Sequence, residues 1–191
     1  GRLANGVGLD TPASAVRILH ALALAGYWVA DIPPGGNTLV EALAAGPTNA
    51  LQNRTGRPIR VRLPLERYEA MLTELPEALR EAIRARWGEP AADPHLADGA
   101  FPLAVLPLGN VVVGVQPARG YHIDPVRTYH DPDLVPPHHY LAFYLWLRRE
   151  WDAHAVVHLG KHGNLEWLPG KAVALSKDCW PEAALGPLPQ L

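Results

Sequence analysis

The segment between Asn110 and His158 constrains the fold of this 191-residue chain more than any other part of the sequence. Residues 110–116 are β-branched and apolar on both faces, which is typical of a strand buried in a parallel sheet. Residues 137–150 predict a buried helix, because they are apolar nearly all round, and residues 153–158 predict a second buried strand. A strand, a helix and a strand of these lengths form a βαβ unit with a right-handed crossover. The sequence therefore predicts an α/β fold with an open, mostly parallel sheet and flanking helices, a Rossmann-like arrangement in three layers.

Four further helices are predicted upstream from capping residues and apolar spacing. They cover residues 12–25, 38–46, 66–74 and 76–87. Asp10 or Thr11 can cap the first of these helices, and Gly26 can end it. Thr38 and Glu41 form a capping-box pattern, which predicts the start of the second helix close to Thr38.

Two short strands and a linker complete the expected organisation. The strands are predicted at residues 27–31 and 59–63, and residues 88–99 are predicted to be loop. We expect three subdomains: an N-terminal α/β piece (1–63), a helical arm with its linker (64–99), and the βαβ unit (100–191). Neither end of the chain carries a terminating element, so we expect a single internal fragment, residues 1–191, of a longer protein.

The composition excludes several classes of protein. An apolar fraction of 48% and a charged fraction of 19% are those of a globular protein rather than a disordered one. A net charge of −2 argues against a nucleic-acid or acidic-membrane surface, although five arginines gather within residues 54–67. Cys179 is the single cysteine, which excludes an internal disulfide. No signal peptide and no apolar run of membrane-spanning length is present, and we expect a cytoplasmic protein.

Polar loops follow both strands of the predicted βαβ unit, at residues 116–122 and 158–166. Ligands bind outside the carboxyl ends of the strands in an open parallel sheet, so we expect both loops to face one crevice. Six of the nine histidines lie between residues 122 and 158, including His138 and His139 at the start of the predicted helix. This concentration indicates metal binding or proton transfer near the crevice.

His158, His162 and Glu166 are spaced four and four residues apart, within a glycine-containing loop. Imidazole and carboxylate groups suit a borderline divalent ion such as cobalt, nickel or zinc. They also suit general acid–base chemistry near neutral pH. A histidine at a strand end is often a hydrogen-bonded core residue instead, and doubled histidines at a helix start are often solvated.

Several common catalytic motifs are absent. The Gly160-Lys161 pair does not complete a phosphate loop, because Ala155 and His162 stand where that loop needs glycine and Ser or Thr. The glycines before residue 10 do not complete a dinucleotide fingerprint, and neither an HExxH nor a paired CxxC pattern occurs. We therefore expect no ATP site in this chain.

Longer segments are recognisable as those of a known family. They are GNVVVGVQPARGY at 109–121, TYHDPDLVPPHHYLAFY at 128–144, HLGKHGNLEWLPGK at 158–171 and CWPEAALGPLP at 179–189. In this order they resemble the large-subunit family shared by ATP-dependent cobaltochelatase (CobN-type) and magnesium chelatase, and NGVGLDTPASAVRILHALALAGY at 5–27 resembles its upstream block. Lys161, Asn164 and Trp167 stand where the magnesium enzyme has threonine, serine and phenylalanine, which favours the cobalt enzyme.

The resemblance implies a function. Members of the family are several times longer than this chain, bind a tetrapyrrole, and act in ATP-dependent metal chelation with an AAA+ ATPase subunit and its companion. The implied substrates are Co²⁺ and hydrogenobyrinic acid a,c-diamide, in aerobic cobalamin biosynthesis, while ATP and Mg²⁺ would be used by the partner subunits. An isolated fragment is expected to be inactive.

The resemblance and the chemistry of the side chains together give a set of candidate site residues. Glu166 is predicted to be the base or a transient metal ligand, with His158 and His162 presenting the metal. The predicted tetrapyrrole-binding residues are Gln116, Arg119, Tyr121, Lys161, Asn164, His138 and His139. Arg119 and Lys161 would pair with carboxylates at the ring periphery.

Three alternatives stay open at this point. The chain could belong to a magnesium chelatase that inserts Mg²⁺ into protoporphyrin IX. It could be a tetrapyrrole-binding module without the insertion chemistry. It could also be a metal-dependent hydrolase that uses His158, His162 and either Asp131 or Asp133.

Overall fold

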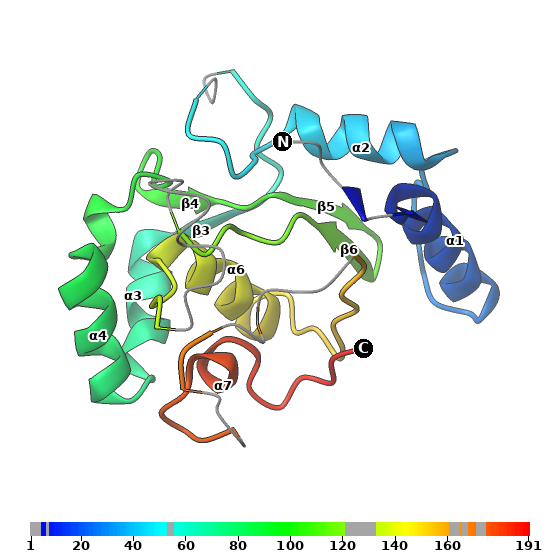
Figure 1. Ribbon diagram of the computed structural model, residues 1–191. Coiled ribbons are helices and arrows are strands. Elements are labelled where there is room, and N and C mark those ends of the chain that lie inside the picture. The colour runs from blue at the N-terminus through cyan, green and yellow to red at the C-terminus, as the bar shows by residue number, and fades with distance from the viewer. Residues whose placement is uncertain are drawn as a thin grey trace. The chain divides into compact units, whose positions relative to one another are not determined.

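The structure, a computed structural model, describes residues 5–6, 8–52, 56–120, 133–160, 165, 168–170 and 175–191. The chain forms two compact units, whose elements are labelled in Figure 1. The first unit comprises Gly1–Val61, Leu103–Gln116 and His158–Gly163, and the second comprises Arg62–Pro102, Pro117–Val157 and Asn164–Leu191. Within the described ranges, none of the helices has the length and apolar content needed to cross a bilayer.

The first unit combines two helices with two short antiparallel strand pairs. Strands β1 (Asn5–Gly6) and β2 (Leu9–Asp10) pair with each other, and β5 (Val105–Leu108) pairs with β6 (Val111–Gly114). Helices α1 (Thr11–Leu24) and α2 (Gly36–Ala45) contact each other. Val16 and Leu19 of α1 and Leu39 of α2 are buried, so the two helices turn apolar faces inward.

The ends of α1 confirm the predicted capping. The Asp10 Oδ1 atom accepts a hydrogen bond of 3.1 Å from the backbone N–H of Ala13, which satisfies a free donor of the first turn. At the other end, Gly26 has φ +94° and its N–H donates to Ala23 O, while the N–H of Tyr27 donates to Leu22 O. This pair of bonds is a Schellman motif, in which glycine adopts the left-handed conformation without a side-chain clash.

Helix α2 begins earlier than the capping-box pattern predicts. It starts at Gly36 with Gly35 as N-cap, no side chain caps it, and Thr38 lies inside the first turn. A Cβ atom on Gly36 would lie 2.7 Å from the backbone nitrogen of Ala13. A close approach to the first turn of α1 therefore requires glycine at this position, and packing rather than a polar cap sets the start of the helix.

Residues 27–31 do not form the predicted strand. They form coil that bonds to the β5–β6 hairpin: the N–H of Asn110 donates to Trp28 O at 2.8 Å, and the N–H of Ala30 donates to Leu108 O at 3.3 Å. These bonds bracket Gly109, which has φ +71° and whose Cβ would lie 2.6 Å from Trp28 O. The hairpin turn thus needs a glycine both for its conformation and for this contact.

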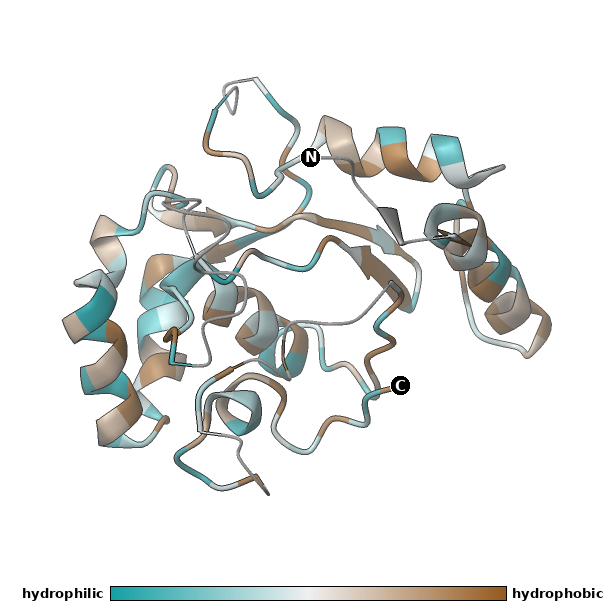
Figure 2. Cartoon of the chain, viewed as in Figure 1, coloured by the Kyte–Doolittle hydropathy of each residue, from teal (hydrophilic) through white to brown (hydrophobic). Residues whose placement is uncertain are grey.

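The prediction of a buried parallel strand at residues 110–116 is wrong. Strand β6 is antiparallel to β5, with Leu108 opposite Val111, and its residues are half-buried or exposed. Figure 2 shows β6 as apolar despite that exposure. The Gly109-Asn110 pair between two apolar runs is a two-residue hairpin signal, and it decides the pairing here.

The second unit contains most of the helices. Strand β3 (Arg62–Pro64) pairs antiparallel with β4 (Ala100–Pro102), so the predicted strand at 59–63 is shorter and lies further along the chain. Helices α3 (Leu65–Thr73) and α4 (Glu77–Trp87) confirm the prediction of two helices separated at Pro76. Apolar and polar residues alternate along α4, as Figure 2 shows, and Leu79 and Ile83 form its buried face. The predicted linker at 88–99 is loop apart from one 3₁₀ turn, η1 (Pro90–Ala92).

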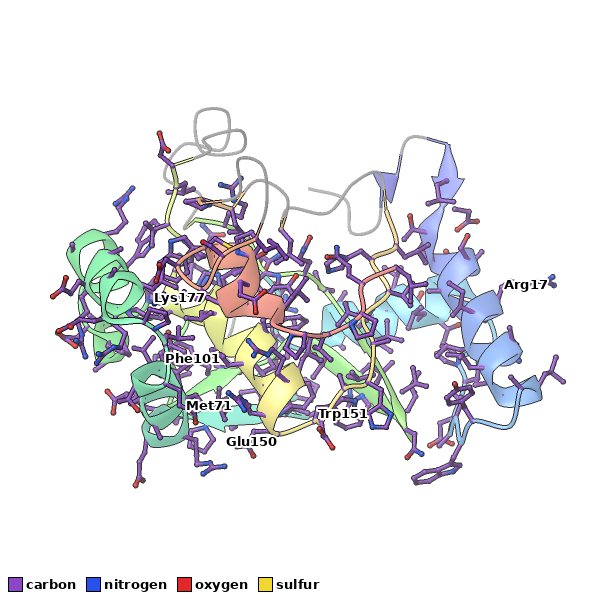
Figure 3. All side chains as sticks on the ribbon, turned by 90° about the horizontal axis from the view of Figure 1, so that it is seen from below. Arg17, Met71, Phe101, Glu150, Trp151 and Lys177 are labelled. Carbon is purple, nitrogen blue, oxygen red and sulfur yellow. The ribbon has the colours of Figure 1, made fainter. Side chains whose placement is uncertain are left out.

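Helix α6 (His138–Arg149) lies at the centre of the core of the second unit. Every residue of this helix from His138 to Leu147 is buried, which confirms the prediction of a helix that is apolar nearly all round. Its last turn carries Arg148 and Arg149, and Glu150 and Trp151 follow it in Figure 3. The short helix α7 (Trp180–Leu185) packs against α6.

The segment 153–158 is not the predicted buried strand. Its residues are exposed or half-buried, and Val156 forms a single parallel bridge with Gln190. Short apolar runs do not distinguish strand from coil by periodicity alone. Since β6 is antiparallel as well, the described residues contain helices and two-stranded antiparallel sheets in place of the predicted βαβ unit and open parallel sheet. The mixture of helix and strand that the sequence predicts is confirmed.

Candidate functional site

Five of the predicted site residues lie outside the described residues: Tyr121, Lys161, His162, Asn164 and Glu166. The predicted metal set of His158, His162 and Glu166 is therefore described only at His158, which is half-buried. Within the described ranges, no group of three histidine, cysteine or acidic side chains is arranged to hold a metal ion.

Gln116 and Arg119 follow strand β6 as predicted. The backbone oxygen of Gln116 accepts a hydrogen bond of 2.9 Å from the Asn49 side chain, which fixes the end of the hairpin within the first unit. Arg119, in the second unit, is only 6% exposed. Burying a guanidinium is costly unless polar groups compensate its charge.

His138 has fixed contacts at both ring nitrogens. Its Nδ1 lies 2.8 Å from the hydroxyl of Tyr68, and its Nε2 lies 3.0 Å from the backbone oxygen of Gly88. Because a carbonyl oxygen can only accept, Nε2 carries the proton and Nδ1 accepts from Tyr68 in the neutral ring. Burial lowers the pKa of His138, which agrees with a neutral imidazole.

His139 belongs to a second buried polar cluster. The Asp93 carboxylate accepts hydrogen bonds from the backbone N–H of His95 at 2.8 Å and from that of His139 at 3.0 Å. The His139 Nδ1 atom lies 3.6 Å from the same carboxylate, and the His95 and His139 rings stack with centroids 3.9 Å apart. Asp93 therefore ties the 88–99 loop to the first turn of α6, a role that sequence reasoning missed because it treated the loop as a linker.

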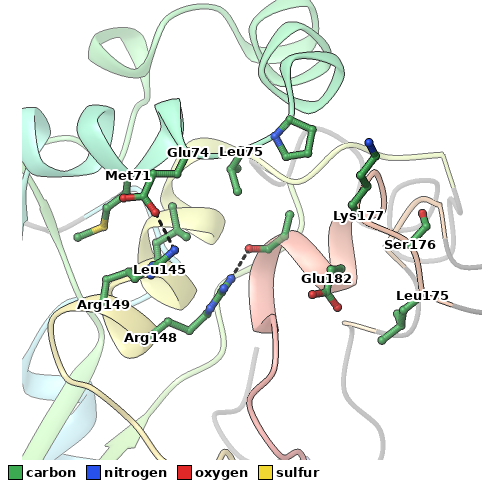
Figure 4. Close-up of a pocket in the computed structure, with 12 residues that line it drawn as sticks. Met71, Glu74, Leu75, Leu145, Arg148, Arg149, Leu175, Ser176, Lys177 and Glu182 are labelled. Carbon is green, nitrogen blue, oxygen red and sulfur yellow. Dashed lines mark hydrogen bonds and ion pairs between the residues drawn. The ribbon is translucent and has the colours of Figure 1, made fainter.

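A cavity of about 450 Å³ opens in the second unit and was also missed. It is lined by the junction of α3 and α4, the last turn of α6, residues 175–177 and α7, as Figure 4 shows. Arg148 and Arg149 reach into it from α6, and Lys177 lies on the facing wall. The only sequence signal was the pair of arginines at the end of the apolar helix, which is typical of ordinary helix-end charge.

All 191 residues match the family model described as CobN/Magnesium Chelatase. The chain belongs to the CobN/magnesium chelatase family. The resemblance expected from the sequence segments is thereby confirmed.

The similarity to individual members of the family extends along the whole chain. It is 56% identical over 191 residues to the aerobic cobaltochelatase subunit CobN of a Sinorhizobium species and 55% identical to that of Pseudomonas aeruginosa. Both matches cover 100% of this chain and 15% of the relative. A magnesium-chelatase subunit of Chlorobaculum parvum is 39% identical over 194 residues, which cover 99% of this chain and 14% of that relative. The chain thus spans about 15% of the length of the cobaltochelatase relatives it matches.

A solved structure of the family has the same fold. The catalytic subunit of cobaltochelatase from Mycobacterium tuberculosis matches 97% of this chain with a TM-score of 0.81 and 45% sequence identity, over 16% of its own length. At 45% identity, the two chains resemble each other in sequence as well as in fold. The two-stranded antiparallel sheets described above therefore occur within a fold that this solved structure shares.

Proposed function

We propose that this chain is part of a cobaltochelatase large subunit, which binds hydrogenobyrinic acid a,c-diamide and inserts Co²⁺ into the corrin ring. The observation that carries the proposal is the 56% identity, along the full chain, to an aerobic cobaltochelatase subunit. Identity to a magnesium-chelatase subunit is lower, at 39%. Insertion of Mg²⁺ into protoporphyrin IX is therefore the less supported alternative, and Lys161, Asn164 and Trp167 also favour cobalt.

The chemistry of insertion needs groups of the kind found in the segment 158–166. The metal must lose its water ligands, and the ring nitrogens must lose their protons. We propose that Glu166 takes a proton or briefly binds the metal, and that His158 and His162 present Co²⁺. Ligands that hold the ion transiently lower the barrier to dehydration without the permanent grip of a closed structural site.

The proposed ring-binding residues fall into two groups by their side-chain chemistry. Arg119 and Lys161 carry charges that complement the ring carboxylates, with Gln116, Tyr121 and Asn164 as further polar contacts. The prediction that His138 and His139 bind the ring stays a prediction. Their contacts with Tyr68, Gly88 and Asp93 support a role in fixing the start of α6.

The proposal also includes partners and context. ATP with Mg²⁺ would be hydrolysed by an AAA+ subunit and its companion, because the chain has no phosphate-loop sequence. We propose that the complex works in the cytoplasm and that residues 1–191, with subdomains near 1–63, 64–99 and 100–191, are inactive by themselves.

The central test is Glu166→Gln in the full-length large subunit, assayed with its partner subunits for Co²⁺ insertion. Loss of the carboxylate should lower the insertion rate by at least about a hundredfold, in the range for a general base, while corrin binding is retained. Glu69→Gln is the matched control, since Glu69 is exposed on α3. Wild-type insertion by Glu166→Gln would refute the assigned role.

A second experiment separates insertion from simple tetrapyrrole binding. In His162→Ala, corrin affinity and Co²⁺ insertion are measured independently. A metal-presenting histidine should leave affinity nearly unchanged and slow insertion, whereas a pure binding residue should change affinity alone. Repeating the assay with Mg²⁺ and protoporphyrin IX tests the magnesium alternative directly.

A further inference from the structure

The cavity in the second unit has the character of a ligand site that is separate from the proposed chelation chemistry. None of its lining residues belongs to the predicted metal or tetrapyrrole set, so the inference does not rest on the proposed function. Its volume of about 450 Å³ lies within the range of small-molecule sites in proteins.

Its cationic side chains differ in how far they are paired. Arg149 forms an ion pair of 2.7 Å with Glu74. Arg148 instead donates from Nη1 to the backbone oxygens of Ala183 and Ala184, at 2.9 and 3.3 Å. In the part of the chain that the structure describes, no carboxylate lies within ion-pair distance of Arg148.

Burial, and after it the neighbouring Arg149, lowers the pKa of the Arg148 guanidinium. A guanidinium nevertheless stays charged at neutral pH. The side chain is thus a half-buried positive charge that donates to neutral carbonyl oxygens, a setting in which an anion would be favourable.

Lys177 adds a second positive charge from the facing wall. It is exposed, and none of the described carboxylates pairs with it. The cations of the cavity exceed its two carboxylates, Glu74 and Glu182, by one positive charge. A single negative charge on a ligand would balance this excess.

The rest of the lining is apolar. Met71 and Leu145 are buried side chains beneath the charged groups, and Leu75 and Pro76 extend the same wall. Leu175, which is 54% exposed, stands beside Lys177 (Figure 4). Leu75 and Pro76 are half-buried and Leu175 is exposed, so an apolar group that covers them would remove apolar surface from water, which is favourable.

We propose that this cavity binds a small organic carboxylate with an apolar body, its charged end held by Arg148 and Lys177. The combination of one excess positive charge with an apolar wall favours a carboxylate over a phosphate, which carries close to two negative charges at neutral pH. The apolar body lies against the half-buried Leu75 and Pro76.

The test uses 2-naphthoate as the probe and calorimetric titration of the full-length protein. The uncharged isostere 2-naphthamide and inorganic phosphate are titrated in parallel. We expect 2-naphthoate to bind at least tenfold more tightly than either, and its affinity to fall as salt is added.

Variants of single charges give the decisive comparison. Lys177→Gln should weaken 2-naphthoate binding about tenfold, the loss of one charge-assisted hydrogen bond. Glu182→Gln should strengthen binding severalfold, because it removes a repelling carboxylate. Arg17→Gln is the matched control, since Arg17 is exposed and projects away from α1 in Figure 3, and it should change nothing.

Four results would overturn the proposal. Equal binding of 2-naphthoate and 2-naphthamide, or absence of 2-naphthoate binding at millimolar concentration, would show that no carboxylate site exists. Tighter binding of phosphate than of 2-naphthoate would assign the cavity to a different anion. Lys177→Gln and Glu182→Gln variants that both bind like Arg17→Gln would show that the cavity charges play no part.

Discussion

Removal of the Tyr68 hydroxyl is the sharpest test of how the core of the second unit is held together. Tyr68 is fully buried, and its hydroxyl lies 2.8 Å from Nδ1 of His138. Its ring makes edge contacts with Phe101 at 5.1 Å and with His138 at 5.6 Å between centroids. Tyr68→Phe keeps these ring contacts and deletes the hydroxyl that bonds to His138.

The expected loss of stability in Tyr68→Phe depends on the hydrogen bonds that His138 keeps. Nε2 still donates to Gly88 O, so the ring keeps its tautomer and Nδ1 becomes a buried acceptor without its hydroxyl donor. Leaving one buried polar atom unsatisfied costs about 1–3 kcal/mol. We therefore expect the free energy of unfolding to fall by about 2 kcal/mol, which in a chain of this size lowers Tm by about 4–8 °C.

Urea unfolding, followed by circular dichroism and tryptophan fluorescence, measures this change. The slope of the unfolding free energy against urea concentration should stay the same, because the mutation barely changes the surface that unfolding exposes. Tyr27→Phe is the matched control, since Tyr27 is 59% exposed, and it should shift the unfolding free energy by less than about 0.5 kcal/mol. If Tyr68→Phe behaves like this control, the reasoning about the buried acceptor is wrong.

Three other positions test further contacts of the fold. Burial lowers the pKa of His138 below its ordinary value of 6.5, so below that pH the unfolded chain binds a proton that the folded protein excludes. The unfolding free energy should therefore fall as pH drops from about 6.5 to the lowered pKa. The His138→Gln variant should lose that dependence in urea titrations. Gly109→Ala should lower the unfolding free energy by about 2–4 kcal/mol, because Gly109 has a positive φ and its Cβ would meet a backbone oxygen. Gly26→Ala, where φ is also positive but the space is open, should lower the unfolding free energy by about 1 kcal/mol. Asp93→Asn replaces one of two acceptor oxygens, so it should lower the unfolding free energy by about 1–3 kcal/mol and lower Tm. Asp98→Asn is the control: its side chain is 85% exposed, and thermal unfolding should be nearly unchanged.

The helices could be predicted from the sequence because local signals set them. Asp10 caps α1, Gly26 ends it, and the break at Pro76 separates α3 from α4. Helix α6 was recognisable because apolar residues cover all its faces. In each case the decisive information lies within a few residues of the element.

The two apolar runs were predicted wrongly for different reasons, one local and one distant. The apolar runs at 110–116 and 153–158 look alike in sequence, yet one forms a hairpin arm and the other is mostly exposed coil. The Gly109-Asn110 pair indicated a hairpin turn before the first run, but the expected βαβ unit was given more weight in the prediction. Nothing local to the second run indicates that it meets Gln190 by one bridge.

The candidate site, like the fold, could be predicted only in part from the sequence. Sequence segments identified the family, because long motifs are specific without any knowledge of geometry. They did not reveal the cavity beside α6, which is assembled from three separate parts of the chain. They also did not reveal that Asp93, in a segment predicted to be a linker, holds the first turn of α6.

The dense grouping of histidines indicates why residue counts are weak evidence for a metal site. In His138 both ring nitrogens have neighbours from the same unit, Tyr68 and Gly88, so this imidazole could turn to a ligand only by giving up two buried hydrogen bonds. That exchange would leave a phenol and a carbonyl without their partner, at a cost of about 1–3 kcal/mol for each buried polar atom left unpaired. His162 lies outside the described residues, in a sequence context of glycine and lysine. The packing therefore supports a structural role for His138 at the start of α6, and the chemical role of His162 stays a prediction.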